Sequence, residues 1–419
     1  MNNPTAPTVA GYGFRRTATP LVLCRLAGQG AEFIGFVVLA RRLGAASFGA
    51  LSVAFLLARY GGLIADWGAS LSGSRDVAVR EDGWTSIVPR LRWRATLSLA
   101  LTAVFLVIAL AVDPAVAPLA VCILARGMNR DWISLGSHRG VRAGVPSLVQ
   151  GVLICSLSIL FVTGDQVLRS STLLATASVV GIGVSVLLNR APDGAVGTVG
   201  LRWSSHLADP WALIIVLADQ ILATADTTLI ALLGSSAQAG IYAAVYRFPN
   251  AWILAQGLLV TGLVPGVSRA LGADPTALRA IRRRALRVGA VAAVVGVALI
   301  PVALWLLPVI FGEAYASGRT ALAILLASSA VSALTIGLLP TVLALGHEKV
   351  LAAGFVGVAA ANVAANLLVI PRFGINGAAT VTLLSQVCLG GVYLVTSHRA
   401  GSAHARSTTA VIDPGAPAG

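Results

Sequence analysis

Charged residues are scarce in this sequence. Only 11% of the 419 residues are Asp, Glu, Lys or Arg, whereas a soluble domain carries about 25%. The hydrophobic fraction is 57%, and the mean hydropathy is +0.86. A surface with so few groups that water can solvate is not stable in water, so the composition excludes a soluble globular protein.

Residues that build metal sites, disulfides and nucleotide-binding loops are few or poorly spaced. The four cysteines all lie in apolar segments without CxxC spacing, and the five histidines lie in loops or tails without ligand spacing. Lys349, the one lysine, is not part of a GxxxxGK[ST] motif. The sequence therefore predicts no metal, no disulfide, no cofactor and no site for ATP.

Long apolar runs dominate the chain instead. A membrane-spanning helix needs about 20 predominantly apolar residues, and about twelve segments meet this requirement. They are 19–40, 47–69, 95–112, 115–133, 146–163, 171–189, 210–233, 241–266, 288–311, 319–345, 350–370 and 375–397. The fourth is the weakest, because Arg126, Arg130 and Asp131 crowd its second half. We therefore predict an all-α, polytopic membrane protein.

The positive charges are distributed unevenly between the predicted loops. If the N-terminus lies inside, 22 of the 30 Lys and Arg residues fall on the cytoplasmic side and 5 on the outer side, while Arg25, Arg59 and Arg247 fall within helices. Such a bias is the positive-inside rule. It predicts a multi-pass protein of the plasma (inner) membrane with both termini in the cytoplasm. The net charge of +14 then indicates contact with anionic membrane lipid and not with nucleic acid.

The predicted helices divide evenly around the polar stretch after residue 190. Six helices on each side would enter the membrane in the same direction, as in parallel transporter repeats. One hairpin supports a repeat, because Ala40–Arg59 and Ile230–Arg247 both read as Gly, a short polar turn, Gly and an apolar helix with an Arg. The expected divisions are an N-terminal bundle 1–195, a cytoplasmic linker 196–209, a C-terminal bundle 210–400 and a flexible cytoplasmic tail 401–419.

Six motifs in order across the chain resemble one known family. The chain resembles the polysaccharide (O-antigen type) flippases of the multidrug/oligosaccharidyl-lipid/polysaccharide exporter superfamily. The motifs are ARRLGAASFGALSVA with IADWG, then DTTLIALLGSSAQAGIYAAVYRF, LVPGVSRAL, IFGEAY, LALGHEK and IPRFGINGAATVTLLSQ.

The resemblance implies both an architecture and an activity. It implies two six-helix bundles around a central cavity, and rocking exchange of a lipid-linked saccharide without covalent chemistry, so the protein is not expected to be an enzyme. The expected function is to flip a polyprenyl-diphosphate saccharide from the inner to the outer leaflet for cell-surface polysaccharide synthesis. The expected partners are the lipid-linked saccharide, membrane lipid and glycan-assembly enzymes.

Charged residues inside the predicted helices require an explanation, because each costs about 2.5–3.5 kcal/mol at the bilayer centre. Three pairs are spaced seven apart, which is nearly two turns, so each pair shares a helix face. The pairs are Arg25 with Glu32, Arg59 with Asp66, and Asp219 with Asp226. These faces are expected to line a bundle interior or a wet cavity.

Two interpretations of these charges stay open. In the functional one, Arg25, Arg59 and Arg247 bind a diphosphate, because guanidinium matches phosphate in a bidentate fashion; related flippases hold arginines in corresponding helices. In the structural one, Arg25 pairs with Glu32. For Asp226, an ion pair with Arg247 is the favoured role.

Ion coupling is a separate hypothesis for the acidic residues. Glu32 and Asp219 could take up protons or sodium, whereas Asp66 lies near a helix end and is expected to act as a cap or interface residue.

Two other function classes are compatible with a polytopic membrane protein. A multidrug exporter of the same superfamily would share the fold, but three membrane arginines favour an anionic substrate over cationic drugs. A membrane glycan polymerase or ligase would need a sizeable outward loop with catalytic groups, and the predicted outward loops are only a few residues long.

Overall fold

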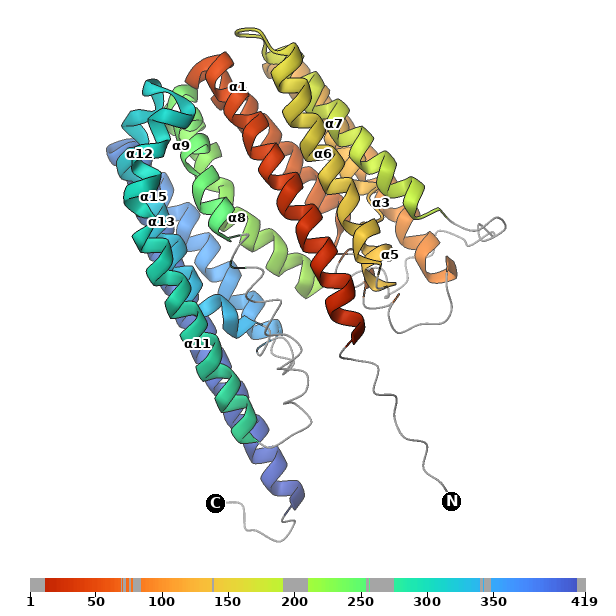
Figure 1. The fold of residues 1–419 in the computed structure, drawn as a ribbon, viewed down its shortest axis with the longest axis vertical. Helices are drawn as coiled ribbons and strands as arrows, with labels where there is room; N and C mark the ends of the chain where they lie inside the picture. Colours follow the sequence, from red (N-terminus) through yellow and green to blue (C-terminus); the bar gives the residue numbers. More distant parts are fainter. Residues whose placement is uncertain are drawn as a thin grey trace. The chain divides into compact units, whose positions relative to one another are not determined.

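The computed structural model describes residues 12–68, 84–137, 139–190, 210–253, 275–339 and 348–412, with the single positions 70, 73, 74, 77, 256 and 342. Every regular element in this part of the chain is helical (Figure 1). The α-helices are α1 Tyr12–Asp66, α3 Trp84–Val112, α4 Ala120–Gly127, α5 Asp131–Gly136, α6 Gly140–Phe161, α7 Val167–Leu188, α8 Pro210–Leu233, α9 Ser236–Val245, α11 Pro275–Ala298, α12 Ile300–Phe311, α13 Arg319–Thr335 and α15 Glu348–Ile412. Short 3₁₀ turns are η1 Pro114–Leu119, η2 Glu313–Gly318 and η3 Ile336–Leu338.

The two longest helices are each broken at a glycine. α1 has a non-helical residue at Gly44 (φ 73°, ψ 170°), and α15 has one at Gly374 (φ 56°, ψ −139°). Positive φ is sterically easy only for glycine, so these residues reverse the chain between two spans. Each long helix therefore accounts for two expected segments, 19–40 with 47–69 and 350–370 with 375–397.

Among the described residues, seven helices are long and apolar enough to cross a membrane, or up to eight if the bent pair α11–α12 is one span. The bend between Arg282–Ala298 and Ile300–Phe311 is 48°, at a position where Pro301 enters the helix. The fourth expected segment is divided into η1, α4 and α5, and most of the eighth, 241–266, lies outside the described residues. The prediction of an all-α polytopic membrane protein is confirmed.

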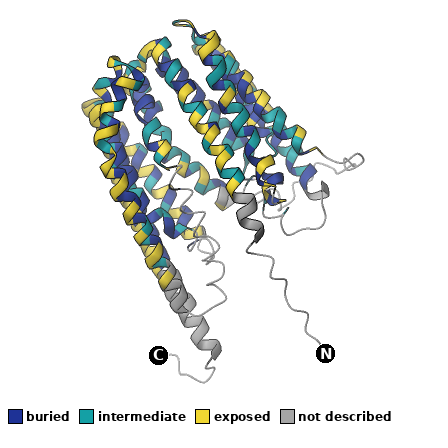
Figure 2. Ribbon diagram, in the orientation of Figure 1, coloured by how far each residue is buried: buried dark blue, intermediate teal, exposed yellow. Residues whose placement is uncertain are grey.

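Large apolar side chains are exposed along the middle of several helices. Val107 and Ile108 on α3, Val294 on α11 and Leu368 on α15 are all more than half exposed. Figure 2 shows exposed positions along much of α11 and α15. A soluble monomer rarely exposes apolar patches of this extent, whereas a lipid-facing surface requires them.

The chain forms two compact units. The first contains Met1–Leu43 and Ala54–Leu213, and the second contains Gly44–Val53 and Ile214–Gly419. The hairpin tip at Gly44–Val53 thus belongs to the second unit although the flanking helices belong to the first. The contiguous bundles 1–195 and 210–400 stay a prediction.

In the first unit, α1 and α6 pack at backbone distance. A Cβ added at Gly151 would lie 1.9 Å from the carbonyl oxygen of Gly28, and one added at Gly28 would lie 2.5 Å from that of Ser147. Small residues allow this approach, as is common between membrane helices. Arg42 then caps the end of α6 by donating to the carbonyls of Ser158 and Val162. These contacts fix the helix that carries Arg25 and Glu32.

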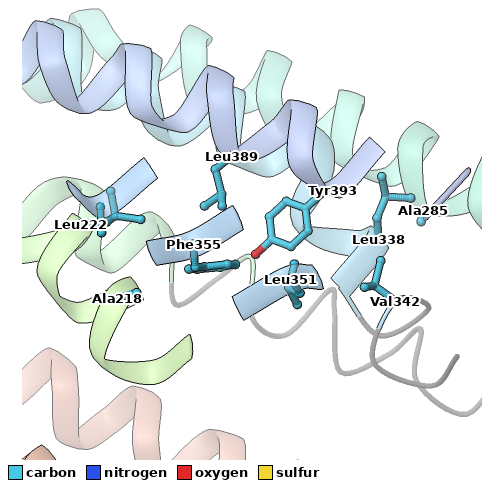
Figure 3. Close-up of a cluster of buried hydrophobic side chains, with 10 residues drawn as sticks. Ala218, Leu222, Ala285, Leu338, Val342, Leu351, Phe355, Leu389 and Tyr393 are labelled. Carbon is cyan, nitrogen blue, oxygen red and sulfur yellow. The ribbon is translucent and has the colours of Figure 1, made fainter. Parts of the chain in front are cut away.

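In the second unit, α8, α11, η3 and both halves of α15 enclose an apolar cluster (Figure 3). Its members are Ala218, Leu222, Ala285, Leu338, Val342, Leu351, Phe355, Ala359, Leu389 and Tyr393. The rings of Phe355 and Tyr393 meet edge to face, with their centroids 5.9 Å apart. This cluster joins helices that are far apart in the sequence.

The charge bias predicts the orientation of the second unit. Ala280 lies exposed on α11, beside the Arg282–Arg284 run that we expect in the cytoplasm. In a cysteine-free background, Ala280→Cys should not react with an impermeant maleimide added to intact cells, and should react after permeabilisation. Strong labelling of intact cells would contradict this topology.

Candidate functional site

Asp226 is the centre of a buried polar site in the second unit. It lies on α8, is fully buried, and accepts hydrogen bonds from three neutral donors. Tyr242 Oη on α9 lies 2.8 Å from its Oδ2, and Asn366 Nδ2 on α15 lies 2.8 Å from its Oδ1. Thr382 Oγ1, beyond the break in α15, donates to the same Oδ2 as Tyr242. Four helical segments therefore converge on one carboxylate.

A second set of amides and hydroxyls extends this site along α15. Asn366 Nδ2 also lies 3.1 Å from Asn362 Oδ1, and Asn362 donates to Ser385 Oγ at 3.0 Å. Asn362 and Ser385 are both buried. The remaining oxygen of this set, Asn366 Oδ1, is buried without a hydrogen-bond partner in the described part of the chain.

The apolar cluster follows the polar site along the same helices. On α8, Leu222 lies one turn before Asp226, and on α15, Phe355 lies about two turns before Asn362. In the returning half of α15, Leu389 lies one turn after Ser385 (Figure 3). The carboxylate is thus separated from the end of the unit by closely packed apolar side chains.

This arrangement limits what the carboxylate can do. A buried charge is costly unless it is paired or neutralised, and the three donors are neutral. Two chemical states would satisfy the site: a protonated carboxyl, or a carboxylate that binds a small cation together with amide and hydroxyl oxygens. No group of three or more His, Cys, Asp or Glu occurs among the described residues, so a transition-metal site is not indicated here.

The first unit contains a buried ion pair at the end of α1. Arg94 on α3 is 1% exposed, and its Nη2 lies 2.6 Å from Asp66 Oδ1. Asp66 also accepts from the backbone N–H of Ser70 at 3.1 Å and from Ser70 Oγ at 2.6 Å. The Asp66 carboxylate therefore binds both the Arg94 guanidinium and the chain just beyond α1. Two other guanidinium nitrogens, Arg94 Nε and Nη1, are buried without a partner in the described residues.

A second arginine, Arg126, lies beside this ion pair. Its aliphatic carbons lie against Gly62, where an added Cβ would be 2.8 Å from Arg126 Cδ and 2.9 Å from its Cβ. The side chain of Arg126 is exposed and that of Arg59, one turn before Gly62, is half-buried. Arg59, Asp66 and Arg94 all interact electrostatically with Arg126.

A polar network fixes the segment that follows Arg126. Ser185 Oγ on α7 lies 3.0 Å from Asn129 Oδ1 and accepts from the backbone N–H of Arg130 at 3.0 Å. Asn129 Oδ1 in turn accepts from the N–H of Asp131 at 2.8 Å. Arg130 Nη1 donates to the carbonyl of Asn189 at 3.2 Å. Arg130 therefore has a structural role, which distinguishes it from Arg126.

The predicted arginines fall in different units. Arg25 and Arg59 lie in the first unit, where Arg25 is exposed and interacts electrostatically with Asp131. Arg247 lies half-buried in the second unit, just beyond α9. A common site for all three stays a prediction.

The predicted acidic residues have distinct environments. Glu32 is half-buried on α1, and Asp219 is exposed on α8, where it interacts electrostatically with Tyr393. The partners of Asp226 are Tyr242, Asn366 and Thr382, and Arg247, the partner favoured from the sequence, is not among them.

Several residues of these sites were not selected from the sequence. Asn366 and Thr382 are neutral, and nothing in their local sequence distinguishes them from other polar residues in the spans. Arg94 and Arg126 were also not selected, although the crowding of charge in the fourth segment, which contains Arg126, indicated that this segment is unusual.

Comparison with known proteins identifies both family and fold. The profile of the family described as "Polysaccharide biosynthesis protein" matches residues 14–271. No curated protein matches the chain. A MATE transporter of Vibrio cholerae is 16% identical, with 93% of this chain and 97% of that chain covered and a TM-score of 0.58. An inward-facing multidrug resistance MATE family transporter of the MOP superfamily is 15% identical, with 92% and 99% covered and a TM-score of 0.63.

At such low identity these structures show the fold alone, which is that of the MATE transporters. The profile match is the stronger result for the family, because it extends over more than half of the 419 residues. Together they confirm the resemblance that the sequence motifs suggested. The chain belongs to the polysaccharide biosynthesis protein family.

Proposed function

We propose that this chain moves a saccharide, linked to a polyprenyl lipid through a diphosphate, from the inner to the outer leaflet of the plasma membrane. The family description supports a role in polysaccharide assembly, and the transporter fold supports movement without covalent change. The lipid-linked saccharide is then the substrate, and the glycan-assembly enzymes on either side of the membrane are the functional partners.

The observation that carries this proposal is the excess of guanidinium groups in the first unit. Arg94 is neutralised by Asp66 in a 2.6 Å ion pair. Arg59 and Arg126 lie beside this pair, where they act on each other as like charges. Unpaired cations within a membrane protein mark a site for an anion, and guanidinium is suited to the oxygens of a diphosphate.

Asp226 supports a second part of the proposal. A buried carboxylate that is not neutralised by a cation of the chain can take up a proton or a monovalent cation from outside the protein. Uptake and release at this site would couple transport to an ion gradient, as transporters of this type commonly do with acidic residues in their spans. Glu32 and Asp219 are further candidates for the same role.

Replacing Arg25 or Arg59 by alanine is expected to abolish export of the lipid-linked saccharide while membrane abundance stays near wild type, because the lost interaction is with the substrate. Arg→Lys should restore export only partly, since an ammonium cannot reproduce the planar fork. The measurement is surface glycan and inner-leaflet lipid-linked saccharide in a complementation strain, set beside protein abundance. Arg142→Ala, an exposed arginine on α6, is the matched control.

Three outcomes separate the interpretations. Normal export in both alanine variants would refute the cationic site. Loss of abundance in step with export would favour a structural role for these charges. Normal surface glycan with increased sensitivity to cationic drugs in the deletion strain would favour a multidrug exporter instead.

A further inference from the structure

We propose that Arg126 forms, together with Arg59, a two-guanidinium clamp that holds the phosphoryl groups of the transported lipid. This inference rests on the proposed function and deepens it, because it adds a substrate-contacting residue from a helix that the sequence analysis placed in a weak, charge-crowded segment. The ligand of the clamp is a phosphoryl anion.

The position of Arg126 is set by close packing between α4 and the second half of α1. Gly61 and Gly62 leave room for two residues of α4: a Cβ at Gly61 would be 2.8 Å from Ile123 Cδ1, and one at Gly62 would be 2.8 Å from Arg126 Cδ. Ile123 is buried whereas the Arg126 side chain keeps an exposed surface. The apolar stem of Arg126 therefore lies against α1 while the residue as a whole keeps an exposed surface, as long cationic side chains commonly do.

Among the described residues, the charges around Arg126 leave it without a neutralising partner of its own. Asp66 is occupied by Arg94 at 2.6 Å and by both donors of Ser70. Asp131 is the other carboxylate that acts on Arg126, and it does so more weakly than Arg59, Asp66 or Arg94. In the part of the chain that the structure describes, no hydrogen bond from the Arg126 guanidinium is recorded.

The guanidinium groups of Arg59 and Arg126 carry like charges that interact, so they repel each other until an anion lies between them. A diphosphate carries several acceptor oxygens and can accept from both groups at once, and Arg is the side chain best suited to such bidentate contacts. The buried Arg94–Asp66 pair would keep both helices in register. Its contribution to the clamp is therefore positional, whereas Arg59 and Arg126 contact the anion.

The test is equilibrium binding of radiolabelled farnesyl diphosphate to the purified full-length protein in nanodiscs of neutral lipid. Wild type should bind the diphosphate and not farnesol. Arg126→Gln and Arg59→Gln should each weaken binding about tenfold to hundredfold, the loss typical of one charge-assisted hydrogen-bonding partner. Because both groups contact one anion, the double variant should lose less than the product of the two single effects. Arg142→Gln should bind as wild type.

A pair of glycine substitutions tests the geometry without removing a charge. Gly62→Ala places a methyl group against the Arg126 stem and should weaken binding several-fold. Gly30→Ala on the first half of α1 adds the same methyl where no atom lies within 4 Å, and it should leave affinity unchanged.

The outcomes distinguish this inference from the proposed function. Wild-type affinity in Arg126→Gln, with lost affinity in Arg59→Gln, would overturn the clamp and leave the proposed function standing. Failure of the wild-type protein to bind the diphosphate would overturn both. If phosphatidylglycerol vesicles displace the probe at equal concentration, the site binds bulk lipid headgroups, and the assignment to the transported lipid is overturned.

Discussion

Replacing Asp226 by asparagine is expected to abolish transport while the protein still reaches the membrane in nearly wild-type amounts. Asparagine has the same shape but cannot bind a cation by charge or exchange a proton. The site also tolerates the asparagine amide, because the hydroxyls of Tyr242 and Thr382 can rotate and accept hydrogen bonds from its NH₂ group. Thr382 already lies 3.1 Å from an alternative acceptor, the carbonyl of Ala378. The charge is thus removed with little loss of packing.

Asp226→Leu should behave differently, because leucine offers no acceptor to the three donors around it. Each buried donor left without a partner costs about 1–3 kcal/mol, so this variant should lose abundance as well as transport. Asp165→Asn, an exposed carboxylate between α6 and α7, serves as the matched control and should keep both. The measurement is glycan export per unit of protein in the membrane.

The Asp226→Asn and Asp226→Leu variants together distinguish an ion-coupling role of the Asp226 carboxylate from a purely structural one. Wild-type export by Asp226→Asn would show that the carboxylate is not the coupling group, and would assign it a structural role. Loss of export in Asp226→Asn with normal abundance would support coupling. Repeating the wild-type assay in sodium-free medium then separates a proton from sodium as the coupled ion, since only a sodium-coupled transporter stops.

The transmembrane segments could be predicted from the sequence because burial in lipid makes a strong local demand on composition. Arg41 and Arg42 interrupt one apolar run and Pro371 and Arg372 interrupt another, so the breaks near Gly44 and Gly374 fell between predicted segments. The fourth segment was harder to predict, because Arg126, Arg130 and Asp131 lower its mean hydropathy. Hydropathy records only the average environment of a helix.

The cost of charge in a membrane also identified Asp226, but not its partners. Arg247 was the partner favoured from the sequence because it carries the opposite charge within a predicted helix. The observed donors, Asn366 and Thr382, are 140 and 156 residues away in the sequence. They are brought to Asp226 by the packing of α15 against α8, and no local pattern encodes which helices pack together. The same applies to Arg126, whose contact with Gly62 depends on how α4 packs on α1.

The two similar hairpins, Ala40–Arg59 and Ile230–Arg247, each carry a glycine that forms a close helix contact in the second unit. When Ala40–Arg59 is aligned with Ile230–Arg247, Gly49 corresponds to Gly240. These two glycines meet: a Cβ at Gly240 would lie 1.9 Å from the carbonyl oxygen of Ala45 and 2.9 Å from the backbone nitrogen of Gly49. A Cβ at Gly49 would lie 1.8 Å from the carbonyl oxygen of Ser236. The two helix backbones are therefore in direct contact, as small residues permit in membranes.

Gly240→Leu is accordingly expected to prevent correct assembly of the second unit, because no rotamer moves Cβ away from the backbone oxygen of Ala45. Gly240→Ala should lower the unfolding free energy toward the upper end of the 1–3 kcal/mol typical of overpacking. Gly357→Ala on α15 is the matched control. No atom lies within 4 Å of a Cβ there, so the better helix former should stabilise by about 0.4–1 kcal/mol. Thermal unfolding of the purified variants in detergent measures the change in stability relative to wild type. This change should be destabilising for Gly240→Ala and stabilising for Gly357→Ala. Equal stability of the two alanine variants would show that the helices bearing Gly49 and Gly240 do not approach this closely.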